Sequence, residues 1–242
     1  MASLEHTARV LRSFNDGRST LTLTQATQLL GLPKSNLSRL LRGMCDAGLL
    51  ESAAPARGYR LGALLHQLRG PGGDAQSLGA RASAAVRRLC DRLGYTGYVS
   101  ALRGADMVGL VHHLGHNPLQ VGVPLGGRLA VDACATGRSM LAEMGDDDVR
   151  ALLGGLVSRA TPQSPATFDE LLQRLALVRR QGWAESQDEA GKGVGALAVA
   201  VRDARTGERL SLCMTYPMAV LDPQERAQAI EILLQARAEL SA

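Results

Sequence analysis

Aromatic residues make up only 3% of this 242-residue chain, so its cores must be built from leucine, valine and alanine. No apolar run approaches the roughly 20 residues that a helix needs to cross a bilayer. The first ten residues, MASLEHTARV, lack the apolar stretch of a signal peptide. Because 45% of the residues are hydrophobic, a disordered chain is excluded. We therefore expect a globular, cytoplasmic protein with no membrane partner.

The chain also lacks a recognisable catalytic or metal-binding pattern. Its four cysteines lie far apart and form no CxxC pair, which argues against a zinc site and a disulfide framework. His112, His113 and His116 are close in sequence, but neighbouring residues in a strand point to opposite faces. No acid–base pair or activated nucleophile can be identified. We predict that the protein is not an enzyme and that it binds neither a metal nor a cofactor.

Positive charge is concentrated at one end of the chain. Residues 1–69 contain nine Lys and Arg against four acids, a net charge of +5, whereas the whole chain carries +4. The remaining residues therefore have a net charge of −1. A basic surplus confined to one segment favours attraction of that segment alone to phosphate groups.

The stretch from Leu23 to Arg42 contains two short helical patterns joined by a tight turn. Gly31 can end the first helix in the left-handed conformation, and Ser35 can cap the second. The second pattern is apolar at positions i, i+3, i+4 and i+7, which are Leu37, Leu40, Leu41 and Met44. Its other faces carry small, donor-rich and cationic side chains, which suit a major groove. This spacing predicts a helix-turn-helix, although two such helices also occur in ordinary helical domains.

A helix at residues 3–14 and a short strand at residues 21–23 are expected before these two helices, with Thr24 capping the next helix. A hairpin from residues 49–51 and 59–61 completes a predicted winged helix-turn-helix. The hairpin loop places Arg57 at its tip, while Arg60 is either a DNA contact or a solvated strand residue. The residues expected at the DNA are Thr24, Lys34, Ser35, Asn36, Ser38, Arg39, Arg42, Arg57 and Arg60.

The sequence Gly70-Pro71-Gly72-Gly73 marks the clearest break in the chain, because three glycines and a proline disfavour a helix. We expect a DNA-binding domain at residues 1–69, a linker and linker helix at 70–93, and a second domain at 94–242. The linker helix is expected to begin at about Asp74 or Ala75. Within the second domain the pattern predicts a sheet with helices on one side. Its strands are expected at 95–102, 107–114, 119–123, 183–187, 195–203 and 209–216, and its helices at 134–144, 146–153, 167–180 and from 222 onward.

The chain resembles the IclR family of bacterial transcriptional regulators along nearly its whole length. The resemblance rests on LTLTQATQLLGLPKSNLSRLLRGMCDAGLLE and GYRLG near the start. Later come VGVPLGGRLAVDACATGRSMLAEM, RRQGWAESQDEAGKGVGALAVAVRD and LSLCMTYP. It implies an α+β protein in which a linker helix joins the winged helix-turn-helix to a GAF/PAS-like effector-binding domain. It also implies a homodimer or homotetramer that binds double-stranded operator DNA, more often as a repressor than as an activator.

The resemblance further implies a pocket for a small organic effector, an organic or aromatic acid being one candidate. Matched by position, its lining comprises Val121, Ala135, Thr136, Ser186, Ala196, Cys213 and Thr215. A pocket with few charged groups favours a less polar or larger ligand than a small keto acid. The alternative is a ligand-sensing or enzymatic domain that carries a vestigial DNA-binding module.

Overall fold

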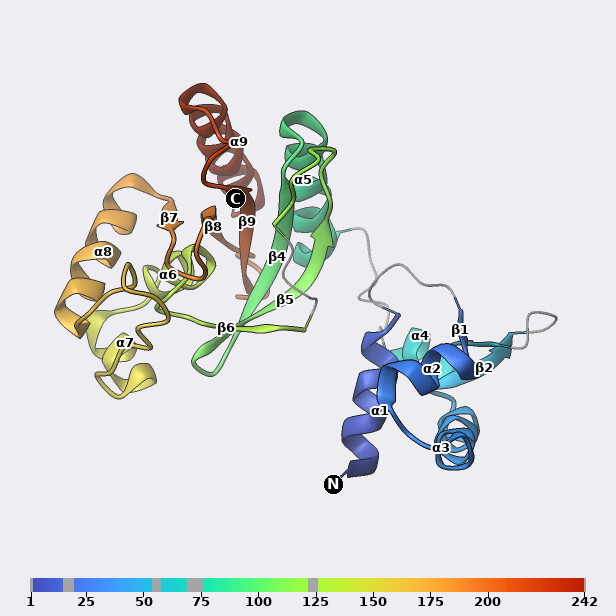
Figure 1. Ribbon diagram of the computed structural model, residues 1–242. Helices are drawn as coiled ribbons and strands as arrows, with labels where there is room; N and C mark the ends of the chain where they lie inside the picture. Colours follow the sequence, from blue (N-terminus) through green and yellow to red (C-terminus); the bar gives the residue numbers. More distant parts are fainter. Residues whose placement is uncertain (1, 15–19, 54–57, 69–75, 122–125, 242) are drawn as a thin grey trace. The chain divides into compact units, whose positions relative to one another are not determined.

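The computed structural model describes residues 2–14, 20–53, 58–68, 76–121 and 126–241. Contacts between residues divide the chain into two compact units, Met1–Asp74 and Ala75–Ala242. Among the described residues, no helix is long and apolar enough to span a membrane. Figure 1 shows the elements of both units.

The first unit combines four helices with a small antiparallel sheet in its described residues. Its elements are α1 (Ala2–Arg12), β1 (Leu21–Thr22), α2 (Leu23–Leu30), α3 (Lys34–Asp46), β2 (Leu50–Ala53), β3 (Gly58–Leu61) and α4 (Ala63–Leu68). The sheet order is β1-β3-β2. Helix, strand, two helices and a hairpin in this order form a winged helix-turn-helix, as predicted, although α4 was not expected.

The apolar face predicted for α3 forms part of the core of this unit. Leu37, Leu41 and Met44 are buried beside Ala26 and Leu30 of α2, while Leu40 is half-buried. Gly31 ends α2 with φ of 66°, the left-handed conformation predicted for it. The period of the leucines therefore located both helices and the turn between them.

Two predicted helix caps are wrong. Thr22 rather than Thr24 caps α2, because the Thr22 hydroxyl and the Gln25 amide oxygen accept each other's backbone N–H. Helix α3 begins after Pro33, whose carbonyl accepts from the Leu37 N–H, so Ser35 already lies in the first helical turn. Ser35 caps nothing and its side chain is exposed.

The second unit is built on a six-stranded antiparallel sheet of order β6-β5-β4-β9-β8-β7. The strands are β4 (Thr96–Arg103), β5 (Asp106–His113), β6 (Arg128–Ala130), β7 (Ala184–Gln187), β8 (Val194–Arg202) and β9 (Arg209–Pro217). The helices are α5 (Leu78–Leu93), α6 (Ala135–Leu141), α7 (Asp146–Leu153), α8 (Phe168–Gln181) and α9 (Pro223–Leu240). Asp222 and Thr167 cap α9 and α8, as their positions in the sequence predicted.

Helices cover both faces of this sheet, so the prediction of helices on one side is wrong (Figure 1). The larger alternate side chains, such as Val199 and Leu212, pack under α5 and α9. The opposite face of β8 and β9 carries smaller ones, including Ala196, Ala198 and Cys213, and faces α6 and α8. Strands buried on both faces lose the alternation of apolar and polar residues from which a one-sided sheet is recognised.

Three segments of the second unit also depart from prediction. Residues 119–121 of the expected strand are not in a strand, and the rest of it, 122 and 123, lies outside the described residues. Strand β6 was missed, because three residues are too few to show a period. The linker helix was expected from residue 74 or 75, but α5 begins at Leu78, after its cap Ser77.

Gly137 allows α6 to lie directly against the preceding loop, since a Cβ at this position would be 1.8 Å from the Val131 carbonyl oxygen. We predict that Gly137→Ala lowers the free energy of unfolding of the second unit by about 3 kcal/mol, the upper range for overpacking. Urea unfolding of the full chain measures it. Gly79→Ala is the control, because nothing lies within 4 Å of its Cβ position in α5 and alanine is the better helix former. Equal stability of the two variants would contradict the close approach.

Candidate functional site

Helix α3 presents an exposed polar surface that is free for a partner. Lys34, Ser35, Asn36, Arg39 and Arg42 are exposed, and Ser38 is half-buried. Within the described part of the chain, the Arg39 and Arg42 side chains have no hydrogen-bond or ion-pair partner. Both guanidinium groups therefore keep their full donor capacity for an external acceptor.

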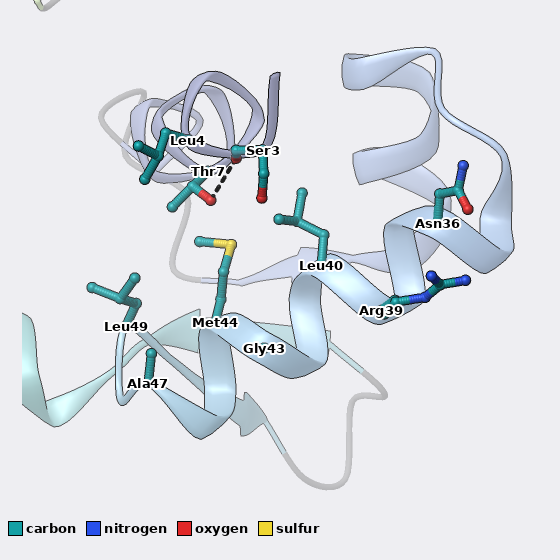
Figure 2. Close-up of a pocket in the computed structure, with 10 residues that line it drawn as sticks. All are labelled: Ser3, Leu4, Thr7, Asn36, Arg39, Leu40, Gly43, Met44, Ala47 and Leu49. Atoms are coloured by element: carbon teal, nitrogen blue, oxygen red, sulfur yellow. Dashed lines mark hydrogen bonds between the residues drawn. The ribbon is translucent and has the colours of Figure 1, made fainter. Parts of the chain in front are cut away.

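A groove of about 470 Å³ runs between α1 and α3, and Figure 2 shows its lining. Leu40 and Met44 point towards α1, whereas Asn36 and Arg39 extend away from it. On α1 the Thr7 hydroxyl donates to the Ser3 carbonyl at 2.9 Å. The apolar side of α3 thus packs towards α1, while its polar side points away from α1.

The other predicted DNA contacts are less clearly placed. Arg60 on β3 pairs with Glu51 on the adjacent strand at 3.0 Å, and the two side chains are 60% and 39% exposed. An exposed pair of this kind contributes little stability, so a phosphate can compete for the guanidinium. Thr24 is exposed on α2. Arg57 lies outside the described residues.

In the second unit a cavity of about 60 Å³ lies between the face of small side chains and the start of α6. Six of the seven residues predicted for the effector pocket line it: Ala135, Thr136, Ser186, Ala196, Cys213 and Thr215. Val121 lies at its edge, where its carbonyl accepts hydrogen bonds from Tyr98 at 3.4 Å and Thr215 at 3.3 Å. The segments that carry these residues, far apart in sequence, meet at this cavity.

Sequence reasoning missed the contribution of β4 and β5 to this cavity. Tyr98, Ser100, Met107 and Gly109 also line it. Thr96, Tyr98 and Ser100 alternate along a strand whose residues are nearly all buried. Hydroxyl groups at every second position of an apolar strand could have indicated that this strand lines the cavity, because a buried polar group needs a hydrogen-bond partner.

The cavity is polar without being charged. Its described lining offers the hydroxyl groups of Tyr98, Ser100, Thr136, Ser186 and Thr215, and no Lys, Arg, His, Asp or Glu side chain. Burial raises the pKa of the Cys213 thiol, and it also raises that of Cys134 despite the hydrogen bond with Thr136. Both thiols are therefore neutral at pH 7, which disfavours a nucleophilic role.

A buried ion pair stands directly beside the cavity. Arg138 of α6 donates to both carboxylate oxygens of Glu189, at 2.6 and 2.9 Å, and their side chains are only 2% and 7% exposed. Arg174 of α8 also donates to Glu189, at 2.7 Å. Removing one partner of such a pair costs roughly 3–5 kcal/mol, because the other charge remains buried. The loop after β7 is thereby joined to α6 and α8.

The neighbouring histidines do not converge on one point. His113 lies 2.9 Å from the Ser83 hydroxyl of α5, while the His112 ring packs edge-on against Tyr98. The two side chains therefore occupy opposite faces of the sheet, as expected for adjacent residues of a strand.

Comparison with known proteins identifies the two units. Residues 74–242 match the model of the bacterial transcriptional regulator IclR C-terminal domain, and residues 3–54 match the IclR helix-turn-helix domain. The chain belongs to the IclR family of transcriptional regulators. Its relatives regulate transcription and are not enzymes.

Individual IclR-family proteins match along nearly their full lengths. The HTH-type transcriptional regulator XynR of Escherichia coli is 29% identical over 99% of this chain and 95% of its own. The glycerol operon regulatory protein of Streptomyces griseus is 30% identical, covering 97% of this chain and 92% of its own. The crystal structure of the IclR-type regulator from Alicyclobacillus acidocaldarius has a TM-score of 0.72 at 25% identity, over 100% of this chain and 98% of that one.

Besides Glu189, another carboxylate of this IclR-family domain is paired with an arginine. This carboxylate, Glu185, makes the free energy of unfolding of the domain depend on pH. Burial would raise the pKa of Glu185, but hydrogen bonds from Arg226 and Tyr216 outweigh it, so the pKa lies below the ordinary 4.5. The Arg226 guanidinium donates to Glu185 at 2.5 and 2.8 Å, and the Tyr216 hydroxyl donates at 2.9 Å. The ionised carboxylate is therefore favoured in the folded state.

Because the folded-state pKa is depressed, Glu185 contributes stability that is present above pH 4.5 and lost as the pH falls through the lower folded-state pKa. We predict that Glu185→Gln destabilises the second unit at pH 7 and that this difference shrinks at acid pH. Urea unfolding of both proteins between pH 7 and pH 3 measures it. A difference that stays constant across this range would contradict the assignment.

Proposed function

We propose that this IclR-family regulator binds operator DNA through the exposed face of α3 and that a small organic metabolite in the second unit changes this binding. The observation that carries the DNA-binding surface is the pair Arg39 and Arg42, exposed and unpaired among the described residues. Leu40 and Met44 point towards α1 whereas Asn36 and Arg39 extend away from it, so the polar side of α3 is the one available to a major groove. The surplus of positive charge in residues 1–69 supports the same surface.

Within this surface the residues have different roles. Arg39, Arg42 and Asn36 contact base edges or phosphates, since Arg pairs with guanine and Asn with adenine. Lys34, Ser35 and Ser38 contact the phosphate backbone of the DNA. Thr24, Arg57 and Arg60 contact the DNA backbone outside the reading helix.

The effector is a small metabolite with hydroxyl or carbonyl groups and without a net charge. The hydroxyl-rich cavity carries no charged side chain in its described lining, which disfavours the organic or aromatic acid named as a candidate from the sequence. At about 60 Å³ it is far smaller than the roughly 300–1,000 Å³ of sites for drug-sized ligands. A compound of a few non-hydrogen atoms fits it as it stands, and a larger one requires it to open.

The regulator acts as a homodimer or homotetramer, and as a repressor rather than an activator. Two copies of α3 then read two half-sites of one operator. The effector controls transcription by binding the DNA-bound and DNA-free states with different affinity, because a ligand without such a difference shifts nothing.

We predict that Arg39→Ala and Arg42→Ala each weaken operator binding by about 1–3 kcal/mol if the side chain reads a base, or lower the salt slope by about one if it binds phosphate. Fluorescence anisotropy with the intergenic DNA upstream of the gene, at several salt concentrations, distinguishes the two. Arg103→Ala is the control, an exposed arginine in the second unit. Unchanged affinity and salt slope in both α3 variants would remove this helix from the DNA.

Thr136→Trp should fill the cavity and abolish the effector response while leaving operator affinity within about twofold, since the cavity holds no DNA contact. Candidate effectors are metabolites of the enzymes encoded beside the regulator, and the response is the change in DNA affinity. Leu177→Trp provides a matched control, because it adds the same side chain at a 47% exposed position of α8. If Thr136→Trp responds like the control, the effector binds elsewhere.

A further inference from the structure

The turn between β7 and β8 forms one wall of the effector cavity. Ser186 at the end of β7, Ala190 within the turn and Val194 at the start of β8 all line the cavity. Ser186 is buried, whereas Ala190 is exposed, so this wall extends from the interior to the surface. A ligand that enters past Ala190 would have to displace this turn.

A single buried carboxylate fixes the turn in place. Glu189 directly precedes Ala190, and its side chain leaves the turn to meet Arg138 of α6 and Arg174 of α8. The Ser164 hydroxyl donates to its backbone carbonyl at 3.0 Å. Thr136, which also lines the cavity, lies two residues before Arg138 on α6. Glu189 therefore ties two walls of one cavity to each other.

The turn also has hydrogen bonds of its own. The Asp188 N–H donates to the Val194 carbonyl at 2.9 Å, and the Asp188 carboxylate accepts from the Gly193 N–H at 2.5 Å. Asp188 has φ of 57°, in the left-handed region that aspartate adopts more readily than most side chains. These bonds shape the turn, whereas its attachment to α6 and α8 depends on contacts outside it, of which the Arg138–Glu189 pair is the most deeply buried.

We propose that Glu189 acts as a latch that keeps the effector cavity closed, and that release of its contacts with Arg138 and Arg174 opens the turn Asp188–Gly193 as the route of ligand entry. Glu189 is a positioning residue here: it lines no part of the cavity and acts through Ala190 and α6. The assignment of this cavity to an effector rests on the proposed function. The closure can be tested without an effector or DNA, so failure of the latch and failure of the proposed function are distinguishable.

The cysteines of the chain report on this opening. Cys134 and Cys213 line the cavity and are 4% and 2% exposed. Cys90 is 1% exposed but belongs to α5 and lies in the core on the other face of the sheet. Opening of the turn exposes the first two thiols, whereas general loosening of the unit exposes all three. Iodoacetamide labelling of the full-length protein, followed by peptide mass spectrometry, measures each rate separately.

Glu189→Gln should raise the labelling rates of Cys134 and Cys213 about tenfold, because loss of the carboxylate charge leaves Arg138 buried and unpaired, while the rate at Cys90 stays within about twofold. Glu185→Gln is the matched control, since it breaks an Arg–Glu pair of β7, the strand before the turn, and its side-chain partners Arg226, Tyr216 and Gln187 lie outside Asp188–Gly193. It should leave the ratio of Cys213 to Cys90 labelling unchanged.

Three results would overturn the latch. These are unchanged cavity labelling in Glu189→Gln, an equal rise at Cys90, and an equal effect of Glu185→Gln. If Glu189→Gln does not fold, Arg174→Gln decides the matter, because Arg174 is 30% exposed and its loss spares the Arg138 pair. About threefold faster labelling of the cavity cysteines then supports the latch, a smaller effect because the Arg174 side chain is partly exposed to solvent, and an unchanged rate overturns it.

Discussion

The ion pair between Arg138 and Glu189 is the interaction on which the architecture of the second unit depends. A guanidinium and a carboxylate that are almost fully buried stabilise a domain only when their remaining donors and acceptors are satisfied. Here they are, because Arg138 also donates to the carbonyl oxygens of Asp132, before α6, and Glu185, on β7. The pair thus connects α6, the β7 edge strand and the following turn, and it gives the small cavity a fixed wall.

The rest of the second unit follows from covering one sheet on both faces. Large residues under α5 and α9 form a dense core, while alanine, serine, threonine and cysteine on the other face leave space. A void lined by hydroxyl groups is stable only if these find partners, as Thr215 and Tyr98 do at the Val121 carbonyl. The same small residues that reduce packing on this face create the site that the proposed effector occupies.

The sequence revealed the parts of the fold that depend on local rules. The spacing of Leu37, Leu41 and Met44 located α3. Gly31, which readily adopts the left-handed conformation, located the end of α2. It could not reveal what depends on tertiary contacts: the helices on both faces of the sheet, the three-residue β6 and the pairing of Glu189 with two distant arginines. Six of seven pocket residues lie together because the family resemblance carried tertiary information that periodicity lacks. Their binding of an effector stays a prediction.

The most direct test is a titration of purified wild-type protein with the DNA upstream of its own gene and with a shuffled sequence of the same composition, at fixed salt. The account predicts tight binding to the first, at least about a thousandfold stronger than to the second, as specific regulators show. It also predicts a shift of this affinity by one uncharged metabolite. Equal and weak binding to both sequences would contradict it, because α3 would then present a charged surface that reads no sequence.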